Sequence, residues 1–177
     1  MKKAKIFLLI IGITLFGSDS LFKKVAADEN SDIVDSYFEE VDYFSILVEL
    51  PKINVKTVVY YGTKSMVEIH KGVALYYQSI LPGEDGNIIL VGHSGNSKVS
   101  HFRDLKKMNE GDSIYIYYQG IKYEYVVFDK KLVESDETSV LQKTKENTLT
   151  LITCNGLFTD KRLVVLAELL FFGPIEE

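Results

Sequence analysis

A cysteine, an arginine eight positions later and three histidines are the residues of this chain that could carry out nucleophilic chemistry. Cys154 is the only thiol, and a thiolate becomes an effective nucleophile when a base or a cation lies near it. Arg162 stays charged at any working pH and could stabilise a developing oxyanion. The alternatives are a buried thiol that packs as a small apolar group and a surface salt bridge for the arginine.

The histidines are the candidate bases, and their positions differ. His93 ends the apolar run "NIILVG" and opens the polar loop "SGNSKVS". A strand end that faces a loop is a common place for functional groups, so His93 is the favoured acid–base residue. His70 precedes a Lys-Gly turn without an identifiable partner, and His101 begins a short helical pattern; for both we expect structural or surface roles.

These groups need a scaffold that brings strand ends together. Period-two alternation predicts eight strands, at residues 45–50, 55–61, 73–77, 87–93, 112–118, 121–128, 148–153 and 162–171. Gln119-Gly120 has the composition of a tight hairpin turn. The spacing of Cys154 and Arg162 allows a loop that returns the second strand beside the first, with both groups at one end.

The connections between these strands contain few helical signals. A short helix fits residues 101–109, where Phe102, Leu105 and Met108 recur at intervals of three, and residues 134–147 form a polar connection with room for one helical turn. Many short strands with few helices indicate a mainly β fold, either a closed barrel or a sandwich.

The N-terminus has the pattern of an export segment. Three lysines within the first five residues precede an uninterrupted apolar run, residues 6–16. Two interpretations stay open: residues 6–22 remain as a membrane anchor with the lysines inside, or a signal peptidase cuts after Ala27. Either way the rest of the chain faces outside, and the favoured localisation is the outer face of the cell membrane, held by a single N-terminal anchor.

Residues 28–44 contain seven acids and no lysine or arginine. Their apolar residues fall on one helical face, which predicts an amphipathic helix or linker that lies on the domain by that face. A regulatory arm across a groove is the alternative. The expected domains are therefore 1–27, the anchor or signal; 28–44, the acidic helix or linker; and 45–175, a catalytic β-barrel.

The composition excludes several classes of function. A net charge of -5 gives no electrostatic support for a nucleic-acid partner. No Gly-rich phosphate loop or metal-ligand cluster is recognisable, so the sequence predicts neither a cofactor nor a metal ion. Glu84, Asp85 and the acids of residues 134–137 are interpreted as solvated loop residues rather than a calcium site.

Four stretches, in order, resemble the sortase family. "TLITC" (150–154) followed by "KRLVV" (161–165) is similar to the family's signature, as is "LPGEDGNIILVGHSG" (81–95). "FRDLKKMNEGDSIYI" (102–116) and "LPKINVKTVVYYGT" (50–63) resemble its short helix with the following strand and its first two strands. The resemblance runs from about residue 50 to residue 170, and the ordered set is more specific than any single piece.

This resemblance implies an eight-stranded sortase-type β-barrel with short helices and an N-terminal helix, and a cysteine transpeptidase outside the membrane of a Gram-positive bacterium. Cys154 would attack the threonine carbonyl of an LPXTG-like sorting motif in a surface protein. His93 would protonate the departing amine, and Arg162 would hold the substrate backbone and stabilise the oxyanion. An amine from a peptidoglycan precursor or a pilin lysine would resolve the acyl-enzyme, without a cofactor.

Three other functions remain. A hydrolase would form the same acyl-enzyme and release it with water. A pilin-polymerising sortase is disfavoured because no second apolar span follows Arg162 and no Asp-Pro-aromatic lid motif occurs in the sequence. The connection after Phe128 is too short for the long helix of class B, so a class A-like or D-like enzyme fits better. A non-catalytic surface binding module would make Cys154 incidental.

Overall fold

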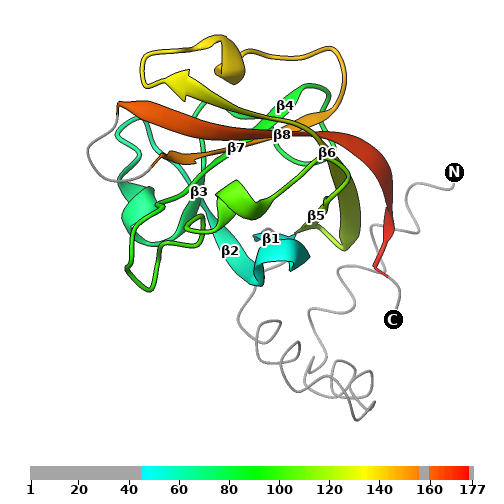
Figure 1. Ribbon diagram of the computed structural model, residues 1–177. Coiled ribbons are helices and arrows are strands. Elements are labelled where there is room, and N and C mark those ends of the chain that lie inside the picture. Colours follow the sequence, from blue (N-terminus) through cyan, green and yellow to red (C-terminus); the bar gives the residue numbers. More distant parts are fainter. Residues whose placement is uncertain (1–44, 156–159, 176–177) are drawn as a thin grey trace, which may run out of the picture. The chain divides into compact units, whose positions relative to one another are not determined.

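The computed structural model describes residues 45–155 and 160–175 (Figure 1). The expected anchor or signal (1–27) and acidic helix (28–44) lie outside the described residues and stay predictions. Within the described part, no helix has the length and apolar content needed to cross a bilayer.

The strands of the described residues close into a barrel, which confirms the barrel rather than the sandwich. They are β1 (Ile46–Leu50), β2 (Val55–Tyr61), β3 (Val73–Leu75), β4 (Asn87–Val91), β5 (Ser113–Tyr118), β6 (Ile121–Glu134), β7 (Thr148–Cys154) and β8 (Lys161–Pro174). Their order around the barrel is β1-β2-β3-β4-β7-β8-β6-β5, and β5 pairs with β1 to close it. The order places β4 beside β7, although 56 residues separate the end of one from the start of the next.

The interior is filled by the apolar residues that the period-two pattern assigned to one face. On β5, Ile114, Ile116 and Tyr118 are buried and alternate with half-buried residues. Successive residues of a strand point to opposite faces, so the same rule identifies the inward residues of the other strands. Leu149 and Leu151 of β7 belong to this core.

The predicted helix at 101–109 is wrong in extent but right in its buried residues. The structure has turns and a 3-10 helix, η4 (Leu105–Lys107), in its place. Phe102, Leu105 and Met108 are all fully buried and close the interior of the barrel. An interval of three aligns side chains in a 3-10 helix, so this pattern does not require an α-helix.

β6 extends well beyond its predicted end, and β8 extends beyond its predicted bounds by one residue at its start and three at its end. β6 and β8 each have 14 residues and pair antiparallel from Ile121↔Pro174 to Glu134↔Lys161, with bulges. The added part of β6 includes Asp129, Lys130 and Lys131, which lack apolar alternation. Their ladder with β8 satisfies the backbone hydrogen bonds, so the strand continues through polar residues.

Two connections between strands have the structure that their sequences predicted. Gln119 and Gly120 both have positive φ, 51° and 75°, and join β5 to β6 as predicted. The connection after β6 contains one helical turn, η5 (Ser139–Leu141), also as predicted. The remaining short helices are η2 (Pro51–Ile53) and η3 (Val67–His70), and η3 becomes important for the site.

Candidate active site

Cys154 is the last residue of β7, and its thiol is free and exposed. Leu149 and Leu151 point into the core, and the side chain of Thr153, which is only 3% exposed, points the same way. Cys154 has the opposite parity, so its side chain projects from the outer face of the barrel. An outward thiol at a strand end is accessible to a large substrate, unlike a cysteine packed in the interior.

Arg162 lies directly across from Cys154. β7 and β8 pair antiparallel with the register Cys154↔Arg162, which confirms the predicted adjacent strand pair. Residues opposite each other on such strands share a face, with Cβ atoms about 4.5–5.5 Å apart. Arg162 Nη1 donates to the carbonyl of Lys161 at 3.4 Å, and none of the ion pairs found among the described residues includes Arg162. The guanidinium is thus not committed to a carboxylate there.

His93 is brought beside Cys154 by the parallel pairing of β4 with β7. The register runs to Val91↔Ile152, and the amide of Gly92 continues it by donating to the carbonyl of Ile152 at 3.1 Å. Extending the register by two residues sets His93 level with Cys154, and neighbouring strands lie about 4.8 Å apart. His93 shares the outward parity of Val91 and Cys154. The structure therefore gathers His93, Cys154 and Arg162 on one outer face, at the ends of β4, β7 and the start of β8; we call this set the strand-end rim.

The backbone that carries His93 is fixed by buried neighbours. Thr153 Oγ1 donates to the carbonyl of Gly92 at 2.7 Å and so ties β7 to the residue before His93. A side chain at position 92 would meet Phe102, because a Cβ there would lie 2.7 Å from its ring. The amide of Phe102 in turn donates to the carbonyl of His93 at 3.2 Å. Gly92 is thus required for close packing, and the loop that follows is tied to the core.

His70 contacts His93, a contact that the sequence did not indicate. His93 Nε2 lies 3.3 Å from His70 Nδ1, and the ring centroids are 5.2 Å apart. His70 is the last residue of η3 and is exposed. Burial, and then the charge of His70, lower the pKa of His93 below its usual value. No local pattern could reveal this pair, since 23 residues separate its members.

His101 lies apart from this pair, with its ring close to Gly72: a Cβ built there would lie 3.5 Å from the ring. It is half-buried, and burial lowers its pKa. No hydrogen bond between its ring and another described residue is found. Among the described residues, no group of three or more His, Cys, Asp or Glu is placed to hold a metal ion.

The outer face of β4 and β7 below the rim is bordered by loops that are anchored to it. The Asn87 side-chain amide donates to the carbonyls of Val140 and Gln142, and its Oδ1 accepts hydrogen bonds from Thr148 and Thr150. This network holds the β6–β7 connection against the barrel. On the β3 side, the hydroxyl of Ser79 accepts a hydrogen bond from the amide of Ile89 at 2.9 Å.

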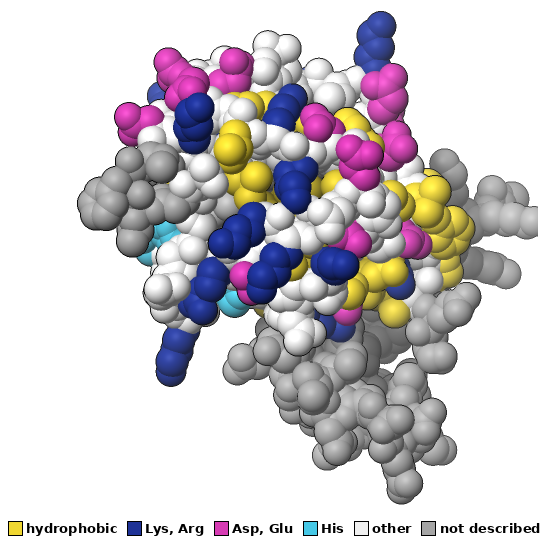
Figure 2. Space-filling view, in the orientation of Figure 1, with side chains coloured by type: hydrophobic (Ala, Val, Ile, Leu, Met, Phe, Trp, Pro, Cys, Tyr) yellow, Lys and Arg dark blue, Asp and Glu magenta, His cyan; other side chains and the backbone are white. Residues whose placement is uncertain are grey.

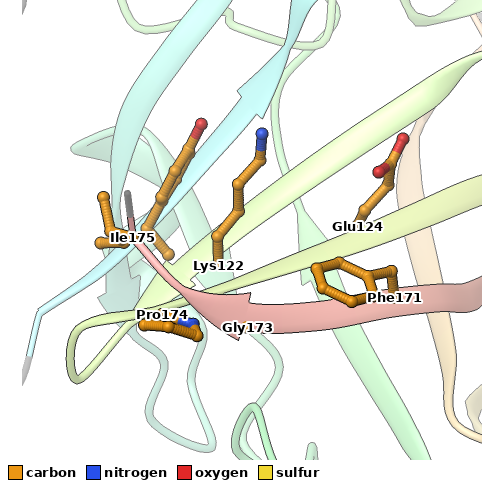
Figure 3. Close-up of a pocket in the computed structure, with 7 residues that line it drawn as sticks. Lys122, Glu124, Phe171, Gly173, Pro174 and Ile175 are labelled. Carbon is orange, nitrogen blue, oxygen red and sulfur yellow. The ribbon is translucent and has the colours of Figure 1, made fainter. Parts of the chain in front are cut away.

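One cavity lies at the other end of β8 and lacks the groups for this chemistry. It has about 400 Å³ and is lined by residues of β5, β6 and β8 and the residue after β8, namely Tyr117, Lys122, Glu124, Phe171, Gly173, Pro174 and Ile175 (Figure 3). It contains no thiol, imidazole or guanidinium. The strand-end rim is therefore the stronger candidate for an active site.

Comparison with known proteins identifies a family for this barrel. The model of the sortase domain matches residues 48–170. Sortase A of Listeria monocytogenes is 32% identical over 123 residues, which cover 69% of this chain and 54% of that protein. Sortase D of Bacillus subtilis is 33% identical over 121 residues, 67% of this chain and 58% of that protein. The chain thus spans little more than half the length of these relatives.

The fold agrees with a solved structure of the same group. The crystal structure of Listeria monocytogenes sortase A superposes with a TM-score of 0.68 at 28% identity, covering 77% of this chain and 93% of that one. A Clostridium perfringens sortase D5 transpeptidase superposes with a TM-score of 0.64 at 26% identity, covering 81% and 91%.

Proposed function

The chain belongs to the sortase family, and from this membership and the geometry of the rim we propose that it is a cysteine transpeptidase. Its substrate is a surface protein with an LPXTG-like sorting motif, and its acceptor is an amine of the cell wall. The observation that carries the proposal is the placement of Cys154 opposite Arg162, with His93 at the end of the neighbouring strand.

In the first step, the Cys154 thiolate attacks the carbonyl carbon of the threonine in the motif. The C–S bond forms as the carbonyl oxygen takes the negative charge, and Arg162 stabilises that oxyanion from across the strand pair. His93, as imidazolium, gives its proton to the departing amine as the C–N bond breaks. The products of this step are a thioester on Cys154 and the released C-terminal peptide.

In the second step, an amine attacks the thioester carbonyl. His93, now neutral, accepts the proton that the amine loses, and the Cys154 thiolate leaves as the new amide forms. Protonated His93 and thiolate Cys154 are restored together, so the cycle needs no cofactor and no external oxidant. An amine from a peptidoglycan precursor is the favoured acceptor.

There are two alternatives to a transpeptidase: a hydrolase, which uses the same three residues, and a binding module, which uses none of them for catalysis. A hydrolase differs only in the resolution of the thioester by water, which depends on the access of the second substrate. A binding module without catalysis is disfavoured, because the thiol of Cys154 is exposed beside a histidine and an arginine instead of packed in the core.

The site of action is proposed from the N-terminal sequence. The lysine-flanked apolar run of residues 6–16 supports a retained anchor that keeps the barrel on the outer face of the membrane. Secretion after cleavage following Ala27 is the alternative. Mass measurement of the protein from cell membranes and from medium separates them, because a protein that starts at Asp28 would exclude the anchor.

One experiment tests the chemistry directly. The full chain is incubated with a library of sorting-motif peptides, with and without a small amine, and both protein and products are weighed by mass spectrometry. A transpeptidase forms an adduct on Cys154 and an amine-linked product that needs the added amine. A product of water alone in both samples would indicate the hydrolase, and the absence of an adduct on every peptide would contradict the proposal.

A further inference from the structure

His70 has no role in the steps above, yet its ring lies against the ring of the proposed acid–base residue. We infer that His70 is a positioning residue for His93 and that the two imidazoles hold a single proton between His93 Nε2 and His70 Nδ1, 3.3 Å apart. The inference rests on the proposed function, in which His93 moves the proton. It adds a second histidine to that proton transfer.

The number of protons follows from the geometry of the contact. A hydrogen bond between two ring nitrogens needs one nitrogen with hydrogen and one with a lone pair. With both rings protonated, two N–H groups and two positive charges would face each other. The pair therefore keeps its bond when it is neutral or carries one charge, and loses it with two.

The contact also fixes which nitrogen of His93 is available. Nε2 is directed at His70, which leaves Nδ1 as the nitrogen that can exchange a proton at the thiol and the substrate amine. The backbone of His93 is already fixed by Phe102 and by the β4–β7 pairing. His70, at the end of η3, adds a contact to the imidazole ring of His93 itself, which limits the rotation of that ring.

Two charged side chains next to His70 are engaged by other groups. Glu68 of η3 accepts hydrogen bonds from the amide and the hydroxyl of Thr63 at 3.0 and 3.2 Å. The ammonium of Lys71 lies over the ring of Tyr60, 5.9 Å from its centroid. The titratable and charged groups on the elements around the pair are Tyr60, Tyr61, Lys64, Glu68, Lys71, Lys98, His101, Arg103, Cys154, Lys161 and Arg162.

A shared proton suits both steps of the reaction. The pair carries one charge before the first step, gives up its proton to the departing amine and becomes neutral. It then recovers one proton from the incoming amine. Burial and repulsion from His70 lower the pKa of His93, which makes its imidazolium a stronger acid toward the departing amine.

The test compares two substitutions of His70 in the full chain, kept in non-ionic detergent. His70 is exposed, so neither substitution leaves a cavity. His70→Ala removes both the bond and the charge, whereas His70→Asn keeps a neutral side-chain amide that can still bond the His93 ring. The pKa of His93 is measured by NMR titration of its ring carbon signals, and kcat and KM are measured against pH with a sorting peptide.

We expect the pKa of His93 to rise in both variants, because the repelling imidazole is gone. In His70→Ala, kcat falls by roughly 10- to 100-fold with little change in KM, as expected for a loosened catalytic ring. In His70→Asn, kcat stays near that of the unchanged protein, although its pH profile moves with the new pKa. This separation of kcat from pKa is not expected if His70 only stabilises the fold.

His101→Asn is the matched control, since it removes a histidine of the same region that lies outside the pair. An unchanged His93 titration in His70→Ala, or an equal shift in His101→Asn, overturns the inference. The NMR readout needs no substrate, so it also distinguishes two failures. If the two histidines are coupled in the NMR titration but turnover does not depend on Cys154, the proposed function is refuted and the histidine pair is not.

Discussion

The two ends of β8 differ in how their polar groups are used. At its start, Arg162 faces an exposed thiol and has no carboxylate partner among the described residues. At its end, the charged groups around the 400 Å³ cavity are engaged: Glu124 accepts from Ser113 at 3.0 Å, and the Lys122 ammonium lies over the Tyr115 ring at 3.9 Å. At the start of β8 the guanidinium of Arg162 has no carboxylate partner in the part of the chain that the structure describes, whereas at the end of β8 the charged side chains contact neighbouring side chains.

The distal end is instead marked by apolar exposure. Leu170, Phe171, Phe172 and Ile175, which we call the apolar patch, are all exposed at the end of β8 (Figure 2). Phe171 lies nine residues beyond Arg162, which is about 30 Å of strand at about 3.3 Å per residue. The comparison shows that the cavity and the exposed apolar residues lie at one end of β8, whereas the proposed reactive groups lie at the other.

The largest expected effect is the loss of turnover in Cys154→Ala. The substitution removes the nucleophile but leaves the outer face and the register of β7 intact, so the barrel should keep its thermal stability. Turnover and the acyl adduct are followed by mass spectrometry, and the melting temperature by circular dichroism. Turnover by a folded Cys154→Ala protein would remove the strand-end rim as the active site.

Arg162→Ala should remove about 2.7 to 4 kcal/mol of transition-state stabilisation, by analogy with the loss of an oxyanion donor, and should lower kcat/KM accordingly. Arg162→Lys is the matched variant, because it keeps the charge but loses the planar set of donors. We expect an intermediate rate for it in steady-state assays with a sorting peptide. An unchanged rate for both would assign Arg162 to the surface and leave the oxyanion without this partner.

A substitution at the apolar patch should affect stability and spare turnover. Phe172 stacks on Tyr123 with ring centroids 5.9 Å apart, and it is 60% exposed. Phe172→Ala should cost about 0.5 to 1.5 kcal/mol of unfolding free energy, the usual worth of such a ring pair. Urea unfolding measures the loss, and Phe172→Leu controls for apolar area. A large fall in kcat at unchanged stability would contradict the separation of the two ends.

The smallest expected effect concerns pH and His101. Burial lowers its pKa from a usual value of about 6.5, so the unfolded chain binds a proton at higher pH than the folded one. Stability therefore falls as pH falls from about 6.5 through the lower folded pKa. His101→Asn should flatten that part of the melting-temperature profile, measured by calorimetry across a pH series. Parallel profiles for the two proteins would show that His101 does not contribute.

The strand positions followed from local pattern because each strand buries one face. Alternation located β2 and β5 almost to the residue, and the Gln119-Gly120 turn followed from its composition. It underestimated β6, whose last six residues are held by pairing with β8 rather than by apolar alternation.

The sequence alone determined the residue types of the candidate site and half of its geometry. A strand that ends at Cys154 and a short loop leave Arg162 few places other than the opposite strand, so that pairing could be predicted from spacing. The parallel pairing of β4 with β7, which sets His93 beside Cys154, joins segments some 60 residues apart. The contact of His70 with His93 depends on where η3 docks. Local periodicity reports which face of a strand is buried, and only the closed barrel decides which strands are neighbours.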